Sequence, residues 1–186
     1  MSEYLALVAC GAPLAARVHE VAAAAQRHGW VVRVVATASA MNWVDAERVE
    51  DITGHAPLVE QRRPGEPKRF PTPGHVVVCP ATFNSINKLA TGIMDNYAAG
   101  LVCEALASGT PLTIVPTVGD ALWGHPALAP HLARLTSAGV RFVDPGSGRV
   151  GDPRPTGGDV DAFNPEWAIP TGTAARTDRV ARPGPR

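Results

Sequence analysis

Residues 4–36, YLALVACGAPLAARVHEVAAAAQRHGWVVRVVA, decide the fold of this chain. The apolar run at 4–10 predicts a buried strand, because a strand covered on both faces of a parallel sheet has no polar side to alternate with. From Pro13 onward the apolar residues recur at helical spacing, and proline suits a first helical turn. A second apolar run, 31–36, directly follows Gly29 and Trp30. The stretch therefore predicts a strand, a tight turn, a helix and a second strand parallel to the first.

The same alternation continues along the chain. Short apolar runs at 76–79, 112–115 and 140–143 are separated by sequence of helical character. Alternation of this kind implies right-handed crossovers, so we predict one α/β domain over residues 1–145. Its expected architecture is a three-layer α/β/α Rossmann-like (flavodoxin-like) parallel sheet.

Two regions depart from this pattern. Residues 41–74 are less regular; they end in an arginine- and proline-rich stretch that we expect to form an exposed basic loop, and residues 58 and 59 are expected to form a short strand. Residues 146–186 are dense in proline and glycine, which predicts a flexible tail.

Composition excludes several functions. The 186 residues contain 17 Lys+Arg and 17 Asp+Glu, so no overall charge favours nucleic acid or an anionic membrane. The apolar runs are far shorter than the ~20 residues that span a bilayer, and no basic lead precedes the first of them. Three cysteines, Cys10, Cys79 and Cys103, form no even disulfide framework and are expected to be buried thiols. We expect a cytoplasmic protein with a small-molecule or protein partner.

Small and hydroxylated residues follow the predicted strands. Ligands of an open parallel sheet bind outside the carboxyl ends of its strands, where small side chains let backbone N–H groups approach a phosphate. A helix beginning near Asn84 or Ser85 would direct its unpaired amides at an anion, which favours a phosphorylated cofactor. The alternative is that these side chains only cap helices. The candidates are Gly11, Ala12, Thr37, Ser39, Pro80, Ala81, Thr82, Asn84, Ser85, Pro116 and Thr117.

Several common sequence motifs for nucleotide binding, hydrolysis and metal binding are absent from the chain. The turn after the first strand lacks the second and third glycines of G-x-G-x-x-G, and the chain contains neither a Walker loop nor a G-x-S-x-G elbow. His125 and His131 are six residues apart, and no pair of histidines, cysteines or acidic residues has the spacing of metal ligands. We therefore predict no metal.

Three motifs resemble those of a known family, the homo-oligomeric flavin-containing cysteine decarboxylases. Residues 80–96, PATFNSINKLATGIMDN, resemble the family's P-A-S-A-N-T segment and its trailing K-x-A-x-G-x-x-D-N. Residues 116–126, PTVGDALWGHP, are similar to its P-x-M-x-x-x-M-W segment. Gly11 with Ala12, and Thr37 with Ser39, form a weaker third match at the ends of the first two strands. Together the motifs cover most of residues 4–143.

The resemblance implies a cofactor, a site and an assembly. It implies that FMN is held by the strand ends, in a homotrimer or a dodecamer built of trimers. It assigns Asn84 to the substrate carboxylate as the catalytic residue, and places Pro116 and Trp123, with Asp95 and Asn96, beside the substrate. The implied substrate is a small thiol or a peptide that ends in a cysteine-like carboxylate. The alternatives are that Asn84 is only a helix cap and Trp123 only a core aromatic. The implied flavin contacts are Gly11, Ala12, Thr37, Ser39, Pro80, Ala81, Thr82, Asn84 and Ser85.

The sequence also departs from the family pattern. The family carries an essential histidine roughly where this chain has residues 65–69, and neither His55 nor His75 stands at that position. Val118 and Leu122 replace methionines, and Gly119 replaces an asparagine, which argues against phosphopantothenoylcysteine as substrate. Two hypotheses follow: an FMN-dependent oxidative decarboxylase, or an FMN-binding protein without decarboxylase activity that serves as a redox sensor or partner subunit. A flavin prenyltransferase has little support in the motifs.

Overall fold

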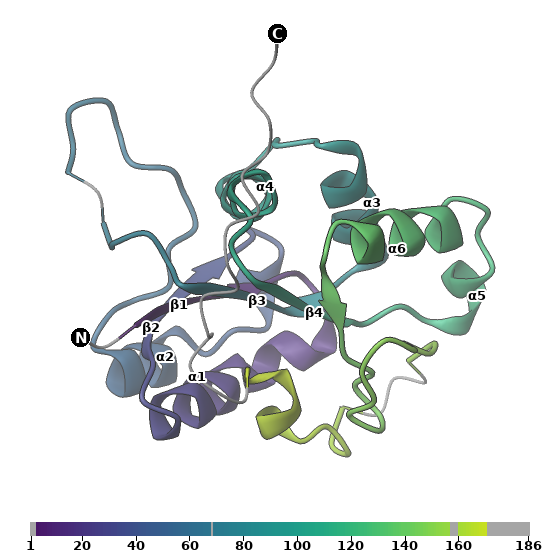
Figure 1. The fold of residues 1–186 in the computed structure, drawn as a ribbon. Helices are drawn as coiled ribbons and strands as arrows, with labels where there is room; N and C mark the ends of the chain where they lie inside the picture. The colour runs from purple at the N-terminus through teal and green to yellow at the C-terminus, as the bar shows by residue number, and fades with distance from the viewer. Residues whose placement is uncertain (1–2, 68, 157–159, 171–186) are drawn as a thin grey trace, which may run out of the picture.

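The computed structural model describes residues 3–67, 69–156 and 160–170. They form a parallel sheet of five strands in the order β2-β1-β3-β4-β5, with helices on both faces (Figure 1). This confirms the predicted three-layer α/β architecture. The strands are β1 (Tyr4–Ala9), β2 (Val31–Ala36), β3 (His75–Ala81), β4 (Leu112–Pro116) and β5 (Arg141–Phe142).

The helices divide between the two faces. In Figure 1, α1, α2 and the short helix η3 lie below the sheet, and α3, α4 and α6 lie above it. The α-helices are α1 (Val18–Arg27), α2 (Ala46–Thr53), α3 (Phe83–Thr91), α4 (Tyr97–Ser108), α5 (Asp120–Trp123) and α6 (Leu128–Ser137). The 3-10 helices are η1 (Pro13–Arg17), η2 (Ala40–Asn42) and η3 (Pro165–Ala168).

The central strand β1 explains why its sequence is continuously apolar. Leu5 and Leu7 belong to the core cluster on the α1 side, whereas Ala6 and Val8 belong to the cluster on the α4 side. All four are at most 1% exposed. Burial of a leucine side chain contributes roughly 1.5–3 kcal/mol, so both faces of β1 stabilise the fold.

Helix α2, in the irregular region, was not identified in the sequence. Helix α2 begins after Asp45, whose carboxylate accepts a hydrogen bond from the Arg48 backbone, and it buries only Val49. One buried side chain gives too weak a periodic signal to predict a helix. Leu58 makes an isolated parallel bridge to Val35 in place of a short strand. The following arginine-rich loop is exposed, as predicted.

Much of the segment expected to be a flexible tail packs against the domain. The buried Asp144 carboxylate accepts hydrogen bonds from the backbone N–H groups of Gly146, Ser147 and Arg154. Further along, Phe163 and Ile169 are buried in the core cluster that contains α1. The tail was predicted to be flexible because of its proline and glycine content, and these few apolar residues gave too weak a signal of packing. The expectation for 171–186 lies outside the described residues.

No helix among the described residues is both long and apolar enough to cross a bilayer. The cysteines Cys10 and Cys79 are buried and Cys103 is half-buried, and all three are free thiols. His75 lies inside β3 and is buried, with its Nε2 atom 2.9 Å from the Thr113 hydroxyl on β4. Burial, together with the nearby Arg141 charge, lowers the pKa of His75 from 6.5 to about 4.

We predict that His75 makes folding sensitive to acid. Between pH 6.5 and about 4 the unfolded chain binds a proton at this site and the native state does not, so stability falls as the pH is lowered through that window. The shift sets an upper limit of about 3 kcal/mol on the loss. Urea unfolding at pH 7 and pH 4 should show a smaller pH dependence for His75→Gln than for the wild type. An equal pH dependence of the unfolding free energy in both proteins would refute the assignment of this effect to His75.

Candidate functional site

A cavity of about 860 Å³ opens at the carboxyl edge of the sheet, and we call it the edge cavity. Its wall is built from segments that follow β1, β2, β3 and β4, as expected for a ligand site in a parallel sheet. The candidates that line it are Gly11, Ala12, Thr37, Ser39, Thr82, Asn84, Ser85, Asp95, Asn96 and Thr117.

The other candidates lie outside this wall. Pro80 and Ala81 are buried within β3, and Pro116 is buried at the end of β4. Trp123, at the end of α5, packs against the core cluster on the α4 side, in agreement with the core-aromatic alternative.

Thr82 organises the start of α3. Its hydroxyl oxygen accepts a hydrogen bond from the Ser85 backbone at 3.2 Å and lies 2.9 Å from the Ser85 hydroxyl. Thr82 is therefore the N-cap, and the alternative that Asn84 caps this helix is wrong. Asn84 is exposed in the first turn, whose backbone N–H groups have no partner within the helix.

The loops after β1 and β2 approach each other closely. The Thr37 hydroxyl lies 3.1 Å from the Ser39 hydroxyl and accepts a hydrogen bond from the Ala40 backbone at 3.2 Å. A Cβ atom added to Gly11 would lie 2.6 Å from the Ser39 hydroxyl oxygen. Glycine at position 11 therefore lets the two loops share one rim of the edge cavity.

The loop between α3 and α4 supplies the opposite rim. Asp95 forms an ion pair with Lys88, and this contact lowers the pKa of the exposed Asp95 carboxyl. Asn96 accepts a hydrogen bond from the Ala99 backbone at 2.9 Å and so caps α4. Both side chains therefore have structural partners in addition to their place at the cavity.

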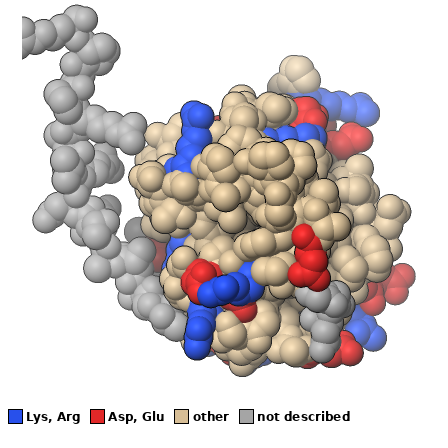
Figure 2. All heavy atoms as spheres, turned by 90° about the vertical axis from the view of Figure 1, so that its right-hand side faces the viewer, with Lys and Arg blue, Asp and Glu red and all other residues tan. Residues whose placement is uncertain are grey.

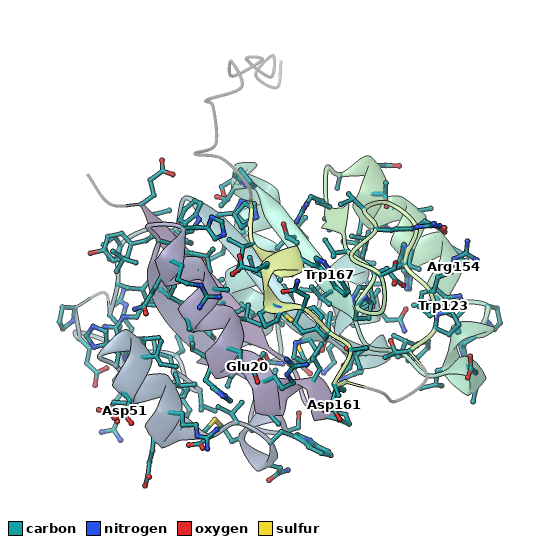
Figure 3. The ribbon with its side chains drawn as sticks, turned by 90° about the horizontal axis from the view of Figure 1, so that it is seen from below. Glu20, Asp51, Trp123, Arg154, Asp161 and Trp167 are labelled. Atoms are coloured by element: carbon teal, nitrogen blue, oxygen red, sulfur yellow. The ribbon has the colours of Figure 1, made fainter. Side chains whose placement is uncertain are left out.

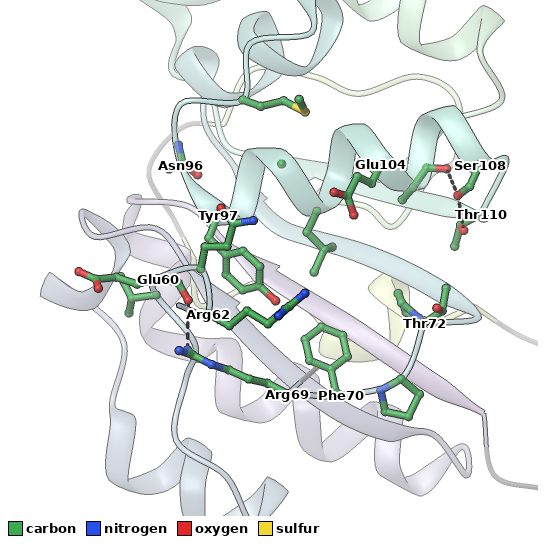
Figure 4. A pocket seen from close by; sticks show the side chains of 18 of the residues that line it. Glu60, Arg62, Arg69, Phe70, Thr72, Asn96, Tyr97, Glu104, Ser108 and Thr110 are labelled. Carbon is green, nitrogen blue, oxygen red and sulfur yellow. Dashed lines mark hydrogen bonds between the residues drawn. The ribbon is translucent and has the colours of Figure 1, made fainter. Parts of the chain in front are cut away.

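A second cavity, of about 960 Å³, lies between the arginine-rich loop and α4, and we call it the loop cavity (Figure 4). Arg62 and Arg69 line it on one side, and Tyr97 and Glu104 of α4 line it on the other. The two cavities share Ala38, Asp95 and Asn96 in their walls, so they adjoin. The Arg69 guanidinium donates to the backbone oxygen of Glu60 at 3.1 Å.

The side chains capable of acid–base chemistry are Cys10, Lys88 and Asp95 in the edge cavity and Glu60, Asp95, Tyr97 and Glu104 in the loop cavity. None of the described residues that line either cavity is a histidine. His55 is exposed, and His131 bonds to Asn87 between α3 and α6. Cys10 lines the edge cavity, but burial raises the pKa of its thiol, and burial likewise raises that of Cys79. Within the described residues no cluster of side chains could hold a metal ion.

Thr117, a sequence candidate directly after β4, also lines the edge cavity, and its buried hydroxyl has no hydrogen-bond partner among the described residues. Sequence reasoning missed another part of the wall. Thr156 and Val160 also line the cavity, but they come from the segment expected to be a flexible tail, so no pattern marked them.

Known proteins resemble this chain in sequence and in structure. A family model described as Flavoprotein matches residues 2–155. The chain belongs to the flavoprotein family. The structure of the FMN-dependent cysteine decarboxylase SpaF is similar, with a TM-score of 0.67 and 28% identity over 81% of this chain and 90% of that one. The FMN-binding protein AtHal3 has a TM-score of 0.66 at 22% identity, over 82% of this chain and 86% of that one, which shows likeness of fold alone.

Curated relatives of this flavoprotein match over part of their length. The coenzyme A biosynthesis bifunctional protein CoaBC of Thermococcus kodakarensis is 32% identical over 128 residues, which cover 64% of this chain and 30% of the relative. Epidermin decarboxylase of Staphylococcus epidermidis is 34% identical over 71 residues, 38% of each chain. The flavoprotein therefore spans about a third of the length of these relatives.

We predict that Gly11→Ala disrupts the edge cavity of this flavoprotein. The added methyl group would overlap Ser39, and overpacking of this kind costs roughly 1–3 kcal/mol. Gly119→Ala is the matched control, because Gly119 lines the same cavity but has nothing within 4 Å of an added Cβ. Denaturant unfolding should show a clear loss of unfolding free energy for Gly11→Ala and little change for Gly119→Ala. Similar losses of unfolding free energy in the two variants would contradict the close contact between Gly11 and Ser39.

Proposed function

We propose that the chain binds FMN in the edge cavity and oxidatively decarboxylates a cysteine-like residue, either a small thiol or the C-terminus of a peptide. The observation that carries the proposal is the convergence of the α3 N-terminus with the loops after β1, β2 and β4 on one cavity. The family match and the likeness to the cysteine decarboxylase SpaF support it.

The cavity suits the two chemical ends of FMN. Backbone N–H groups of the first turn of α3 and the hydroxyls of Thr82 and Ser85 suit a phosphate. Apolar side chains such as Val118 and Leu122 suit a flavin ring, and the unpartnered Thr117 hydroxyl is available to a polar edge of that ring. The volume of about 860 Å³ lies within the range of roughly 300–1,000 Å³ typical of ligand pockets.

Bound FMN supplies an acceptor for the two electrons removed when the substrate thiol carbon is oxidised to a thioaldehyde. The C=S bond of the thioaldehyde then accepts the electron pair released when the bond to the carboxylate breaks and carbon dioxide leaves. Asn84, exposed at the cavity, is placed to donate its side-chain N–H groups to that carboxylate. Asp95 and Asn96 form the rim through which the substrate enters.

The loop cavity offers room for the rest of a peptide substrate. It adjoins the edge cavity, and its wall carries two arginines, Arg62 and Arg69, together with the acidic residues Glu60, Asp95 and Glu104. We propose that this basic loop covers the substrate. Arg63 and Lys68 belong to the same loop in the sequence, and Lys68 lies outside the described residues.

We also propose self-association, as a homotrimer or a dodecamer built of trimers. Large apolar side chains are exposed near the cavities, with Met94 at 60% and Leu122 at 46%. Figure 2 shows a broad area without charged side chains on the face that lies to the right in Figure 1. Depletion of charged side chains is typical of the centre of a protein interface. The three free thiols suit a reducing compartment, so the cytoplasm remains our proposed location.

A second candidate function has a specific observation in its favour. The described residues lining the two cavities include no histidine, the residue type that the resembling decarboxylases carry as essential. This favours an FMN-binding protein that acts as a redox sensor or partner subunit without decarboxylating a substrate. Both candidate functions include bound FMN, and only the first includes turnover of a substrate.

We predict that the purified protein is yellow and that heating releases FMN, identified by chromatography and mass spectrometry. Incubated with peptides ending in cysteine, the flavin-loaded protein should release carbon dioxide and shorten the peptide by the mass of carbon dioxide and two hydrogen atoms. FMN without product on any thiol tested would favour the second candidate. A colourless protein that does not bind added FMN would refute both.

We predict that Asn84→Ala lowers turnover by on the order of 10² while FMN stays bound, because the variant loses donors to the reacting carboxylate. The side chain makes no hydrogen bond within the described residues, so the melting temperature should change little. Asn42→Ala, at an exposed asparagine that lines neither cavity, is the control. Full activity of Asn84→Ala would exclude this role.

A further inference from the structure

Part of the edge cavity wall comes from the C-terminal segment of the same chain. Thr156 and Val160 line the cavity, although they lie more than a dozen residues beyond the last strand. The Thr156 backbone N–H donates to the Val118 oxygen at 2.8 Å, and its hydroxyl donates to the Pro116 oxygen at 3.4 Å. These bonds attach the segment to the end of β4.

Arg17 holds the other end of this wall. Its Nη1 atom donates to the backbone oxygen of Val160 at 2.5 Å and to that of Asp161 at 3.2 Å. Arg17 ends η1, the short helix that directly follows the loop of Gly11 and Ala12. A single guanidinium therefore joins the segment at 160–161 to the element that leads away from the β1 loop.

The orientation of Arg17 is fixed by a second contact. Its Nε and Nη2 atoms donate to the two carboxylate oxygens of Glu20 at 3.1 and 2.7 Å. This two-point pairing is stronger and more directional than a single ion contact. Figure 3, which views the molecule from below, shows Glu20 on α1 close to the segment that carries Asp161. The Arg17 side chain is only 20% exposed, so solvent competes little for these bonds.

We propose that Arg17 is a positioning residue for flavin binding: it does not line the cavity, and it acts by holding Val160 in the cavity wall. This inference rests on the proposed binding of FMN in the edge cavity. The C-terminal segment is then a working part of the cofactor site, supplied by the chain's own residues. Without the guanidinium, the wall at Val160 loses its anchor and the bound flavin becomes more exposed.

Arg27 offers a matched comparison. Its guanidinium binds the Glu166 carboxylate at 2.6 Å and so also attaches the C-terminal segment to α1. Neither Arg27 nor Glu166 lines either cavity. Glu166 also lies 2.7 Å from His28 Nε2, so loss of Arg27 reports a partial loosening of the C-terminal segment away from the cavity, whereas loss of Arg17 reports the effect at the cavity wall.

The test compares Arg17→Gln, Arg17→Lys, Glu20→Gln and Arg27→Gln with the wild type, all as full chains. The readouts are the FMN dissociation constant, from quenching of flavin fluorescence, and the melting temperature without flavin. We expect Arg17→Gln to weaken FMN binding about tenfold, the effect of losing one charge-assisted hydrogen-bonding group, and Arg27→Gln to change it less than about twofold. Glu20→Gln should weaken binding in the same direction by less, and Arg17→Lys should restore part of the affinity.

The outcomes separate this inference from the proposed function. Wild-type protein that binds FMN, with equal affinities in Arg17→Gln and Arg27→Gln, would overturn the role of Arg17 and leave the proposed function intact. A lowered melting temperature in Arg17→Gln without weaker FMN binding would also overturn it, since that would show a structural role only. Wild-type protein that binds no FMN would refute the proposed function, and this inference with it.

Discussion

Three backbone hydrogen bonds at the carboxyl edge of the sheet hold the site together. Thr37 donates to Ala9 at 3.0 Å, Cys10 donates to Pro80 at 3.0 Å, and Thr117 donates to Ala81 at 2.7 Å. Each bond joins the end of one strand to its neighbour in the order β2-β1-β3-β4. The loops that form the edge cavity therefore leave the sheet in fixed register, and their positions follow from the pairing of buried strands.

The dependence of the loop positions on strand pairing explains which parts of the site could be predicted from the sequence. Strands buried on both faces are continuous apolar runs, so β1 to β4 were located to within two residues at either end, and the loops after them were found as a consequence. Ten candidates taken from those loops and from the α3–α4 turn line the edge cavity. Pro80, Ala81 and Pro116 do not, because they still belong to the buried strands whose ends they mark.

The features that were missed depend on few residues or on distant contacts. Which residue caps α3 is decided by one hydroxyl within hydrogen-bond reach of the Ser85 backbone, although asparagine is a better cap than threonine by residue type. The segment after β5 is ordered by Asp144 and by a few apolar side chains such as Phe163 and Ile169. By composition, the proline and glycine content of this segment predicts flexibility, because only a few of its residues are apolar enough to indicate packing. Thr156 and Val160 could be assigned to the site only once that segment was placed.

The chemistry available at the edge cavity bears on the missing histidine. The Cys10 thiol stays protonated because burial raises its pKa, and the Asp95 carboxylate is paired with Lys88, so neither side chain is placed to shuttle a proton. Loss of carbon dioxide requires a well-oriented carboxylate and an electron-poor atom beside it, and the second requirement is met by oxidation of the substrate. Proton removal is needed only at the thiol, which ionises far more readily than a carbon acid. In the proposed function, Asn84 orients the carboxylate and oxidation of the substrate supplies the electron-poor atom, so that proposal does not depend on a histidine among the described residues lining the cavity.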